Sequence, residues 1–567
     1  MKFRWSKGNK TNGASRQGLA TTTTTHYAAQ GSGNIGWEKS LERVIPAIVV
    51  IRVCSVRAFD GYDASYSYAT GFVVDKERGI VLTNRHVVTP GPVIADAVFI
   101  NKEEVELFPL FYDPVHDFGF YRFDPKSVKF LDIAEIELSP EGAQVGVEIR
   151  VVGNDSGEKL SILPGILARL DREAPFYGKE DYNDFNTFYY AAASSSSGGS
   201  SGSPVLTREG KAVALNCGAV EAAAAAFFLP LHKVVKALSL IQKGEKVQRG
   251  TVQTILKHTA FDEVRRLGLS TEKEAEIRKA FPTETGTLVV NQVIPQGPAY
   301  GILDPGDVVL RINHKMVTTF LPWEDMLDSR VGGEVEVEFQ RGGIEMTAKI
   351  KVGDLHDITP SEYVEVSSAL LHPLSYQQAK NHNLPCCGVY MAFGGYMLAR
   401  GGLVEKCLIN AVGLDPTPDL DTFEAAVSKH PDGARVAVRF TVLRDHHRVR
   451  TAVITIDRKW FPMERWRRDD RDGVWHATPS PLPPPYTPPT ETVRGAGMVS
   501  TSSVVEGQAL AAAKPKPQAK AVGRGIRVRV ETGGEVSGAE GAAPRGGEGS
   551  SEQEVDGGGS ETAGPGG

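Results

Sequence analysis

The sequence predicts a mainly β chain, in which an all-β unit precedes two α+β units and a low-complexity tail. Three observations lead to this fold class. Short β-rich runs separated by Gly, Pro and Asp fill residues 36–245, as in a barrel or sandwich. Residues 246–355 and 356–463 each mix strands with one or two helices. Residues 464–567 become rich in Pro, Gly, Ser and Glu, which cannot bury a core, so we expect disorder there.

The composition is that of a globular protein of several domains, since 567 residues exceed one ordinary domain and 41% are apolar. A net charge of -6 gives no general attraction to nucleic acid, so we expect no such partner. The five cysteines are odd in number and lack C-x-x-C spacing, which favours reduced thiols inside the cell and no metal site. The longest apolar runs, 44–53 and 222–231, are shorter than the ~20 residues that span a bilayer, so we expect no membrane partner.

The first segment, 1–35, is poor in apolar residues and carries a threonine run at 21–25, so we expect it to be disordered. Its basic, acid-poor start also leaves a transit peptide open. The unit that follows ends in a helix over 231–244, where apolar residues recur at helical spacing before a glycine. The strand runs of this unit are 47–53, 69–75, 79–84, 96–101, 104–110, 118–124, 148–154 and 212–217.

The serine-rich stretch SSSSGGSSGSPV, residues 194–205, reads as a flexible linker unless one of its serines is a nucleophile. A serine hydroxyl needs a base to take its proton and an acid to orient that base. His86 follows an apolar strand run, and two aspartates, Asp113 and Asp117, compete for the role of the acid. With Ser201 as the nucleophile, the chain order His, Asp, Ser is that of a chymotrypsin-like double β-barrel.

The turn before the nucleophile is suited to an oxyanion hole. A glycine two residues before Ser201 lets the backbone of Gly199, Ser200 and Ser201 turn so that the N–H groups of Gly199 and Ser201 converge on one point. Two such donors stabilise a tetrahedral intermediate, and losing one typically costs about 10²–10³ in rate.

The stretches ATGFVVDKERGIVLTNRHVV, DPVHDFGFYRFDP, VGNDSGEKLSILPGILARLDR and GGSSGSPV resemble the HtrA (Deg) serine proteases, above all the long PDZ-bearing branch of fungi and plants. The resemblance implies His86 as general base, Asp117 rather than Asp113 as its orienter, and Ser201 as nucleophile. Two departures are Ser200 and Ser203, where these enzymes commonly have Asn and Gly. The long branch also carries a second, degenerate protease half and further PDZ units, whereas the second PDZ-like unit here is followed by low-complexity sequence.

Residues 285–317 read strand, turn, short helix, turn, strand and resemble the core of a PDZ domain, which implies that 246–355 bind C-terminal peptides as an added strand. The run RRLGL could supply free N–H groups for the peptide carboxylate at Leu267, Gly268 and Leu269, or its leucines could be core. The unit 356–463 resembles a PDZ domain more loosely, which favours docking over peptide capture. Residues 374–380 look like the start of a helix.

The primary specificity pocket is expected near Ser194–Ser197 and along Ala222–Ala226. Neither stretch offers a carboxylate to pair with a basic side chain, so we expect cleavage after small or medium aliphatic residues. The alanine run could equally be barrel packing.

We therefore expect an ATP-independent serine endopeptidase for unfolded or damaged proteins, whose PDZ units recruit substrate or gate activity. We expect neither a cofactor nor a metal. The alternatives are a latent PDZ scaffold or chaperone that binds peptides without cleaving them, and a hub that works through the Pro-rich tail. The resemblance also leaves open a homo-oligomer, for example a trimer, and a nuclear or cytoplasmic location rather than an organelle.

Overall fold

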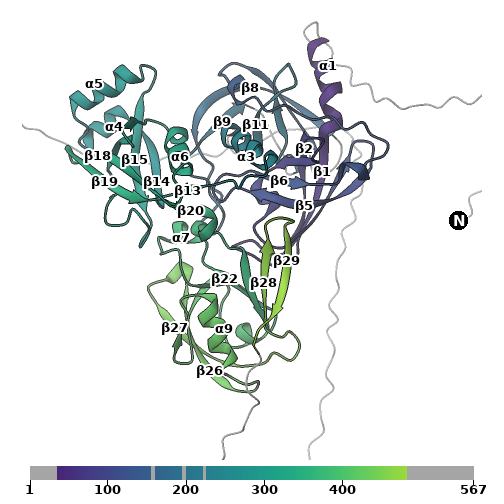
Figure 1. Cartoon of the computed structure of the whole chain (residues 1–567), viewed down its shortest axis with the longest axis vertical. Helices are drawn as coiled ribbons and strands as arrows, with labels where there is room; N and C mark the ends of the chain where they lie inside the picture. The colour runs from purple at the N-terminus through teal and green to yellow at the C-terminus, as the bar shows by residue number, and fades with distance from the viewer. Residues whose placement is uncertain (1–34, 155–159, 194–198, 221–224, 482–567) are drawn as a thin grey trace, which may run out of the picture. The chain divides into compact units, whose positions relative to one another are not determined.

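The computed structural model of the chain describes residues 35–154, 160–193, 199–220 and 225–481. The expected disordered segments therefore lie outside the described residues, except for residue 35 and residues 464–481. The described part is mainly β, and two six-stranded closed barrels are followed by two sheet-based units, as the sequence predicts (Figure 1).

The first barrel closes in the order β1-β2-β3-β6-β5-β4. Its strands carry apolar residues at alternate positions or in continuous runs, because their inward-facing side chains fill the barrel. Phe72, Val81 and Phe120 are fully buried there. The strands are β1 Ile48–Ser55, β2 Ser65–Asp75, β3 Ile80–Thr83, β4 Val93–Phe99, β5 Glu104–Tyr112 and β6 Gly119–Arg122.

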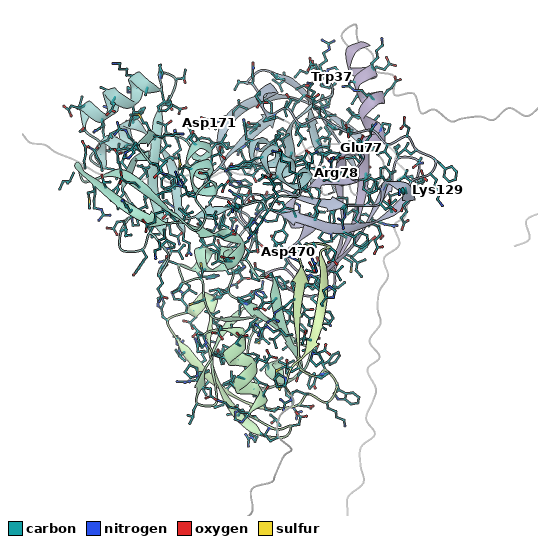
Figure 2. All side chains as sticks on the ribbon, in the orientation of Figure 1. Trp37, Glu77, Arg78, Lys129, Asp171 and Asp470 are labelled. Atoms are coloured by element: carbon teal, nitrogen blue, oxygen red, sulfur yellow. The ribbon has the colours of Figure 1, made fainter. Side chains whose placement is uncertain are left out.

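The second barrel closes in the order β10-β11-β12-β9-β8-β7. Helix α1, Ile35–Val44, precedes the barrels, and Trp37 on it is labelled in Figure 2. Helix α3, His232–Gln242, follows the second barrel and confirms the helix predicted over 231–244. The strands are β7 Glu148–Asn154, β8 Leu160–Glu173, β9 Phe188–Ala193, β10 Pro204–Leu206, β11 Ala212–Val220 and β12 Ala225–Pro230.

The first PDZ-like unit is built on a sheet of order β14-β15-β16-β18-β19, with β17 paired to β16 and the short pair β13-β20 beside it. Trp323 is fully buried in its core. The elements are β13 Gly250–Thr251, β14 Thr254–Ala260, α4 Phe261–Arg266, α5 Thr271–Ala280, β15 Gly286–Val293, β16 Val308–Ile312, β17 Lys315–Met316, α6 Phe320–Asp328, β18 Glu334–Arg341, β19 Ile344–Lys351 and β20 Gly353–Asp354.

The second PDZ-like unit repeats this arrangement in β22-β23-β24-β26-β27, with β25 paired to β24, and extends it by β21, β28 and β29. Helix α7 confirms the helix start predicted at 374–380. The elements are β21 Glu362–Val366, β22 Ala369–Pro373, α7 Tyr376–His382, β23 Val389–Gly394, α8 Met397–Arg400, β24 Cys407–Val412, β25 Asp415–Pro416, α9 Leu420–Ser428, β26 Arg435–Val442, β27 Val449–Thr455, β28 Glu464–Asp469 and β29 Val474–Pro479.

The hairpin β28–β29 corrects the expectation that disorder begins at residue 464. Strand β28 pairs with β21, and its Trp466 ring stacks on Tyr363 with centroids 5.9 Å apart. Arg465 is buried and forms an ion pair of 2.8 Å with Glu362. The charged run looks like a solvated tail in sequence, but the strand forms because β21 supplies a distant pairing partner. Asp470, in the hairpin turn, is labelled in Figure 2.

Two buried polar networks join the PDZ-like units to the barrels. The Arg249 guanidinium, before the first unit's sheet, lies 2.7 Å from an Asp113 carboxylate oxygen of the first barrel and 3.0 Å from one of Asp328 on α6. At the second unit, the Asp60 backbone N–H donates to His372 Nε2 at 3.0 Å, and the Ser375 hydroxyl donates to the Asp60 carboxylate at 2.7 Å.

Within the described residues, no helix is both long and apolar enough to cross a membrane.

Candidate active site

His86 lies on the short helix α2, Arg85–Val88, directly after β3. The first N–H groups of a helix have no partner inside it, and the Asp117 carboxylate supplies one by accepting from the His86 backbone N–H at 3.1 Å. The same carboxylate lies 2.8 Å from the imidazole, between Asp117 Oδ2 and His86 Nδ1. One aspartate therefore fixes both the backbone and the ring of His86.

Asp117 is buried, and its own backbone is held on both sides. Its N–H donates to Asp184 Oδ2 at 2.8 Å, and its carbonyl accepts from the Asn84 side-chain amide at 2.9 Å. Burial would raise the pKa of the Asp117 carboxyl, but the charge of His86 and the hydrogen bonds from it outweigh burial and lower that pKa. The carboxylate is thus ionised at neutral pH and accepts the Nδ1–H of His86.

Asp184 is a buried carboxylate that sequence reasoning missed, because nothing in the polar run 181–186 distinguishes it from exposed loop acids. It accepts hydrogen bonds from the Tyr189 hydroxyl at 2.7 Å and from the Arg85 guanidinium at 3.2 Å. Burial raises its pKa to about 6, with the nearby Asp117 charge adding to the effect and Arg85 opposing it. Asp184 positions Asp117 through that residue's N–H.

The loop that carries Ser201 is tied to the first barrel through its backbone. Thr70 of β2 donates its N–H to the Ser201 carbonyl at 2.8 Å and its hydroxyl to the Gly199 carbonyl at 2.9 Å. Thr83 of β3, three residues before His86, donates its hydroxyl to the Thr70 carbonyl at 2.8 Å. These bonds hold the loop against β2 and β3, next to the short helix α2 that carries His86.

Glycine is required in this loop at the position after the serine. Gly202 has a φ of +83°, and a Cβ there would lie 2.0 Å from the Thr70 carbonyl oxygen and 2.4 Å from the Thr83 hydroxyl. Gly199 also has a positive φ, of 93°. Within the described part of the chain, the backbone N–H groups of Gly199 and Ser201 have no acceptor, as an oxyanion hole requires. Ser200 is buried, and its carbonyl accepts from Asn216 Nδ2 at 2.8 Å.

The structure brings His86 and Asp117 into direct contact and ties the Ser201 backbone to the same barrel. Among the described hydrogen bonds, none joins the Ser201 hydroxyl to the imidazole, and such bonds are often long before substrate binds. The residues expected at the specificity pocket, Ser194–Ser197 and most of Ala222–Ala226, lie outside the described residues.

The competing acid, Asp113, faces away from the imidazole towards Arg249, at 2.7 Å. Its neighbour His116 is buried and donates its Nε2–H to the Phe185 carbonyl at 3.2 Å. Burial lowers the pKa of His116 to about 3, with the Arg249 charge adding to it and Asp113 opposing it. Asp113 thus belongs to the joint to the first PDZ-like unit, and His116 lies beside it, donating its backbone N–H to Asp113 at 2.7 Å.

The proposed carboxylate loop at Leu267–Leu269 is not a loop of free N–H groups. The Leu267 N–H donates to the Val264 carbonyl at 3.0 Å, that of Gly268 to Arg265 at 3.0 Å, and that of Leu269 to Val264 at 3.2 Å. Leu269 is also buried in an apolar cluster. The expectation that these residues hold a peptide carboxylate is therefore wrong for this conformation, because the end of α4 already uses their donors.

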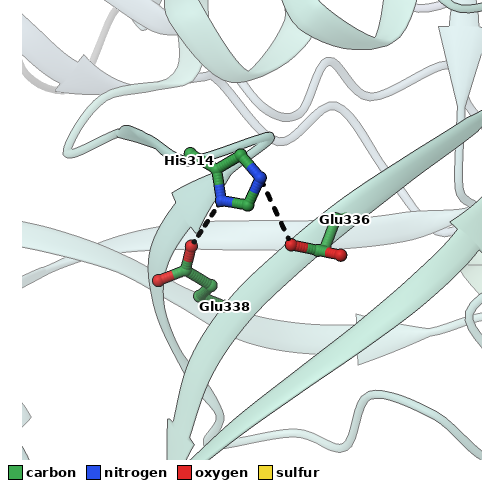
Figure 3. A group of neighbouring side chains, drawn as sticks. All are labelled: His314, Glu336 and Glu338. Atoms are coloured by element: carbon green, nitrogen blue, oxygen red, sulfur yellow. Dashed lines mark hydrogen bonds and ion pairs between the residues drawn. The ribbon is translucent and has the colours of Figure 1, made fainter.

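A further group of titratable side chains, His314, Glu336 and Glu338, lies on the sheet of the first PDZ-like unit (Figure 3). The two ring nitrogens of His314 face different carboxylates, with Nδ1 at 3.4 Å from Glu338 and Nε2 at 3.6 Å from Glu336. Arg311 also pairs with Glu338, at 3.0 Å. The ring bridges two carboxylates, so we interpret the group as surface ion pairs.

Three stretches of the chain match known domain families. Residues 69–215 match the trypsin-like peptidase domain, residues 289–341 match the PDZ domain, and residues 357–433 match a PDZ-like domain. The first match includes the segments that carry His86, Asp117 and Ser201.

Similar curated proteins come from plants and fungi. Protease Do-like 7 of Arabidopsis thaliana is 49% identical over 465 residues, covering 80% of this chain and 42% of that protein. Pro-apoptotic serine protease NMA111 of Phaeosphaeria nodorum is 47% identical over 473 residues, covering 82% of this chain and 46% of that protein. The chain thus spans about half the length of the curated relatives it matches.

A solved structure entitled HtrA-type protease AlgW with decapeptide is also similar to the chain. It is 18% identical, with a TM-score of 0.42, and the match covers 56% of this chain and 98% of that one. A likeness of this degree carries no argument about the chain.

Proposed function

Because the chain belongs to the HtrA-like serine proteases, we propose that it is a serine endopeptidase whose reacting groups are Ser201, His86 and Asp117. The observation that carries the proposal is the 2.8 Å contact between Asp117 Oδ2 and His86 Nδ1. That contact leaves Nε2 as the nitrogen available to a nucleophile, and it occurs within the matched peptidase domain.

In the proposed mechanism, His86 Nε2 takes the proton of the Ser201 hydroxyl while Oγ bonds to the carbonyl carbon of the scissile peptide. The N–H groups of Gly199 and Ser201 stabilise the oxyanion. The imidazolium then protonates the leaving amine, the C–N bond breaks, and an acyl-enzyme forms. A water molecule, deprotonated by His86, attacks the ester carbon, and the imidazolium gives its proton to Ser201 Oγ as the Oγ–C bond breaks, which releases the carboxylic acid product. Asp117 remains ionised throughout and stabilises the imidazolium.

The test is labelling of the full chain with a fluorophosphonate probe, read by mass spectrometry, together with cleavage of unfolded casein. Ser201→Ala should lose the label, and casein cleavage should fall by about 10⁴-fold or more. Ser203→Ala is the matched control, because this nearby hydroxyl donates to the Ser200 carbonyl at 2.6 Å, and the variant should keep the label. If Ser201→Ala is still labelled or still cleaves casein, the nucleophile is misassigned.

We propose unfolded or damaged proteins as substrates, with cleavage after small or aliphatic residues and protein quality control as the role. A homotrimer and a location in the nucleus or cytoplasm are further parts of this proposal, and they rest on the family resemblance. The cleavage specificity is tested by the cleavage sites in casein. The trimer is tested by sedimentation of the purified chain, and the location by imaging of a tagged chain. Cleavage mainly after Lys or Arg would overturn the specificity.

A further inference from the structure

Strand β14 is an edge of the first PDZ-like sheet, so one row of its backbone N–H and C=O groups has no strand partner. PDZ domains bind an extended peptide by adding it to a sheet edge, where the peptide's backbone pairs with such groups and its side chains enter pockets. What already touches this edge therefore decides whether a peptide can bind.

The Asn186 side chain, from the segment between β8 and β9, pairs with this edge as a peptide group would. The Leu256 N–H donates to Asn186 Oδ1 at 2.7 Å, and Asn186 Nδ2 donates to the Thr254 carbonyl at 3.1 Å. The second Nδ2 hydrogen donates to Glu324 of α6 at 3.1 Å. Asn186 is only 5% exposed, and its backbone has a φ of +52°. One amide thus bridges the edge strand and the helix beside it.

Phe188, two residues on, places an aromatic ring against the same two elements. Its ring centroid lies 4.9 Å from that of Phe320, the first residue of α6, and 5.3 Å from that of His258 on β14, both edge-to-face. Phe188 also packs on the apolar core of the PDZ-like unit. A hydrogen-bonding amide and an apolar ring at alternate positions are the two features that an added peptide strand presents.

The edge continues past this contact into open space. A cavity of about 1110 Å³ is lined by Lys257, His258 and Ala260 of β14 and, across from them, by Asp171 and Phe176 (Asp171 is labelled in Figure 2). A peptide therefore has room along the second half of β14, while Asn186 and Phe188 hold the first half.

We propose that Asn186–Phe188 is an internal ligand of the first PDZ-like unit. An extended peptide with an aromatic side chain gains the full length of the β14 edge only by displacing it. This inference concerns binding and does not depend on the proposed peptidase activity. If the groove is open in only a fraction of the molecules, the apparent affinity for an added peptide is reduced by that fraction.

The test uses a fluorescein-labelled synthetic peptide that copies residues 183–189, Asn-Asp-Phe-Asn-Thr-Phe-Tyr. Its affinity is measured by anisotropy on the full chain carrying Ser201→Ala, which prevents cleavage if the proposed function holds. Adding Asn186→Ala and Phe188→Ala should tighten binding at least about tenfold, because the groove is vacated. Phe185→Ala is the matched control, since this neighbouring ring packs on Tyr376 of the second unit, and it should leave the affinity unchanged.

Equal affinity in the double variant and its parent, or equal tightening by Phe185→Ala, overturns the proposal. A second measurement covers the case in which the double variant does not fold. Hydrogen exchange of the Leu256 amide should speed up at least about tenfold in Asn186→Ala alone, because Oδ1 is its acceptor. The Val290 amide, which donates to the Asp307 carbonyl inside the unit, reports that the sheet remains intact. An unchanged Leu256 rate with a normal Val290 rate also overturns the proposal.

Discussion

The two PDZ-like units share one strand order and differ in what lies against the equivalent edge. In the first unit, β14 is the last strand of the sheet, and its Thr254 and Leu256 backbone groups pair with the Asn186 side chain instead of another strand. In the second unit, the equivalent strand β22 is interior, because β21 pairs with it and β28–β29 extend the sheet further. The same fold thus yields one edge that a peptide can take by competition and one that the chain has covered itself.

Their attachments to the barrels differ as well. The first unit is joined by the buried ionic network around Arg249. The second is joined by the buried polar contacts around Asp60, by the more exposed ion pairs of Glu180 with Lys406 and Arg444, and by the β28–β29 hairpin. On that hairpin, the Arg468 guanidinium donates to the Tyr112 hydroxyl of the first barrel at 2.7 Å. The comparison teaches that the second unit is built as a support and the first as a binding module, which four substitutions can test.

The largest effect is expected at the joint of the first unit. Arg249→Ala removes the cation that pairs with the buried carboxylates of Asp113 and Glu324, while Asp328 keeps its ion pair with Lys233. This change should lower the free energy of unfolding by about 3–5 kcal/mol. Chemical denaturation measures this loss. Arg266→Ala, at the exposed end of α4, is the control and should cost less than about 0.5 kcal/mol. Equal losses in the two variants would contradict an ionic joint.

The next effect is expected at the covered edge of the second unit. Trp466→Ala removes the ring that stacks on Tyr363 and should lower the free energy of unfolding by about 2–3 kcal/mol, since the tryptophan is partly buried. Limited proteolysis should then cut within 464–479 first. Trp460, which is 70% exposed, provides the control in Trp460→Ala. A hairpin that stays protected in Trp466→Ala argues against its role as a cover.

A smaller loss is expected where the second unit meets the first barrel. Asp60→Ala removes the acceptor of the Ser375 and Tyr182 hydroxyls and should cost about 2 kcal/mol. Asp60→Asn should cost less, because burial raises the pKa of Asp60 and so disfavours its charged form, and the amide oxygen can still accept. The exposed Asp63→Ala is the control, and denaturation curves compare all three. A larger loss in Asp60→Asn than in Asp60→Ala would refute this reasoning.

The effect that is smallest at neutral pH is a pH dependence beside the first joint, which grows only as the solution is acidified. The pKa of His116 is lowered to about 3 in the folded chain, whereas an unfolded histidine has 6.5. The unfolded state therefore binds the proton first as the pH falls from about 6.5 towards 3, and stability drops by about 1.4 kcal/mol per pH unit in that window. His116→Gln, which cannot take up a proton, should reduce the slope of stability against pH by this amount. Identical slopes in melts at stepped pH would show that His116 is not the group.

Much of this architecture could be predicted from local sequence. The apolar runs of both barrels fall in strands β1 to β7 and β11, because alternation and turn residues are local signals. Chain order alone could predict that an aspartate, Asp113 or Asp117, contacts His86, but the choice of Asp117 needed the family resemblance. Asp113 instead pairs with Arg249, which is 136 positions away.

The features that sequence missed depend on distant partners. Strand β28 forms because β21 lies beside it, and the run containing Arg465, Arg467 and Arg468 reads as a solvated surface without that neighbour. Asn186 is a polar residue in a loop until the β14 edge is placed against it. Leu267–Leu269 failed as an anion loop because the helix before them ends by using their N–H groups, which composition does not reveal.

Gly202 has a consequence for the newborn chain. The close approach of its backbone to Thr70 and Thr83 means that the serine loop is seated only where it contacts the first barrel. His86 and Asp117 leave the ribosome well before Ser201, and the second barrel must close and dock before the three can meet. If the proposed mechanism holds, a half-made copy therefore carries a base without a nucleophile and has no peptidase activity until the second barrel has folded.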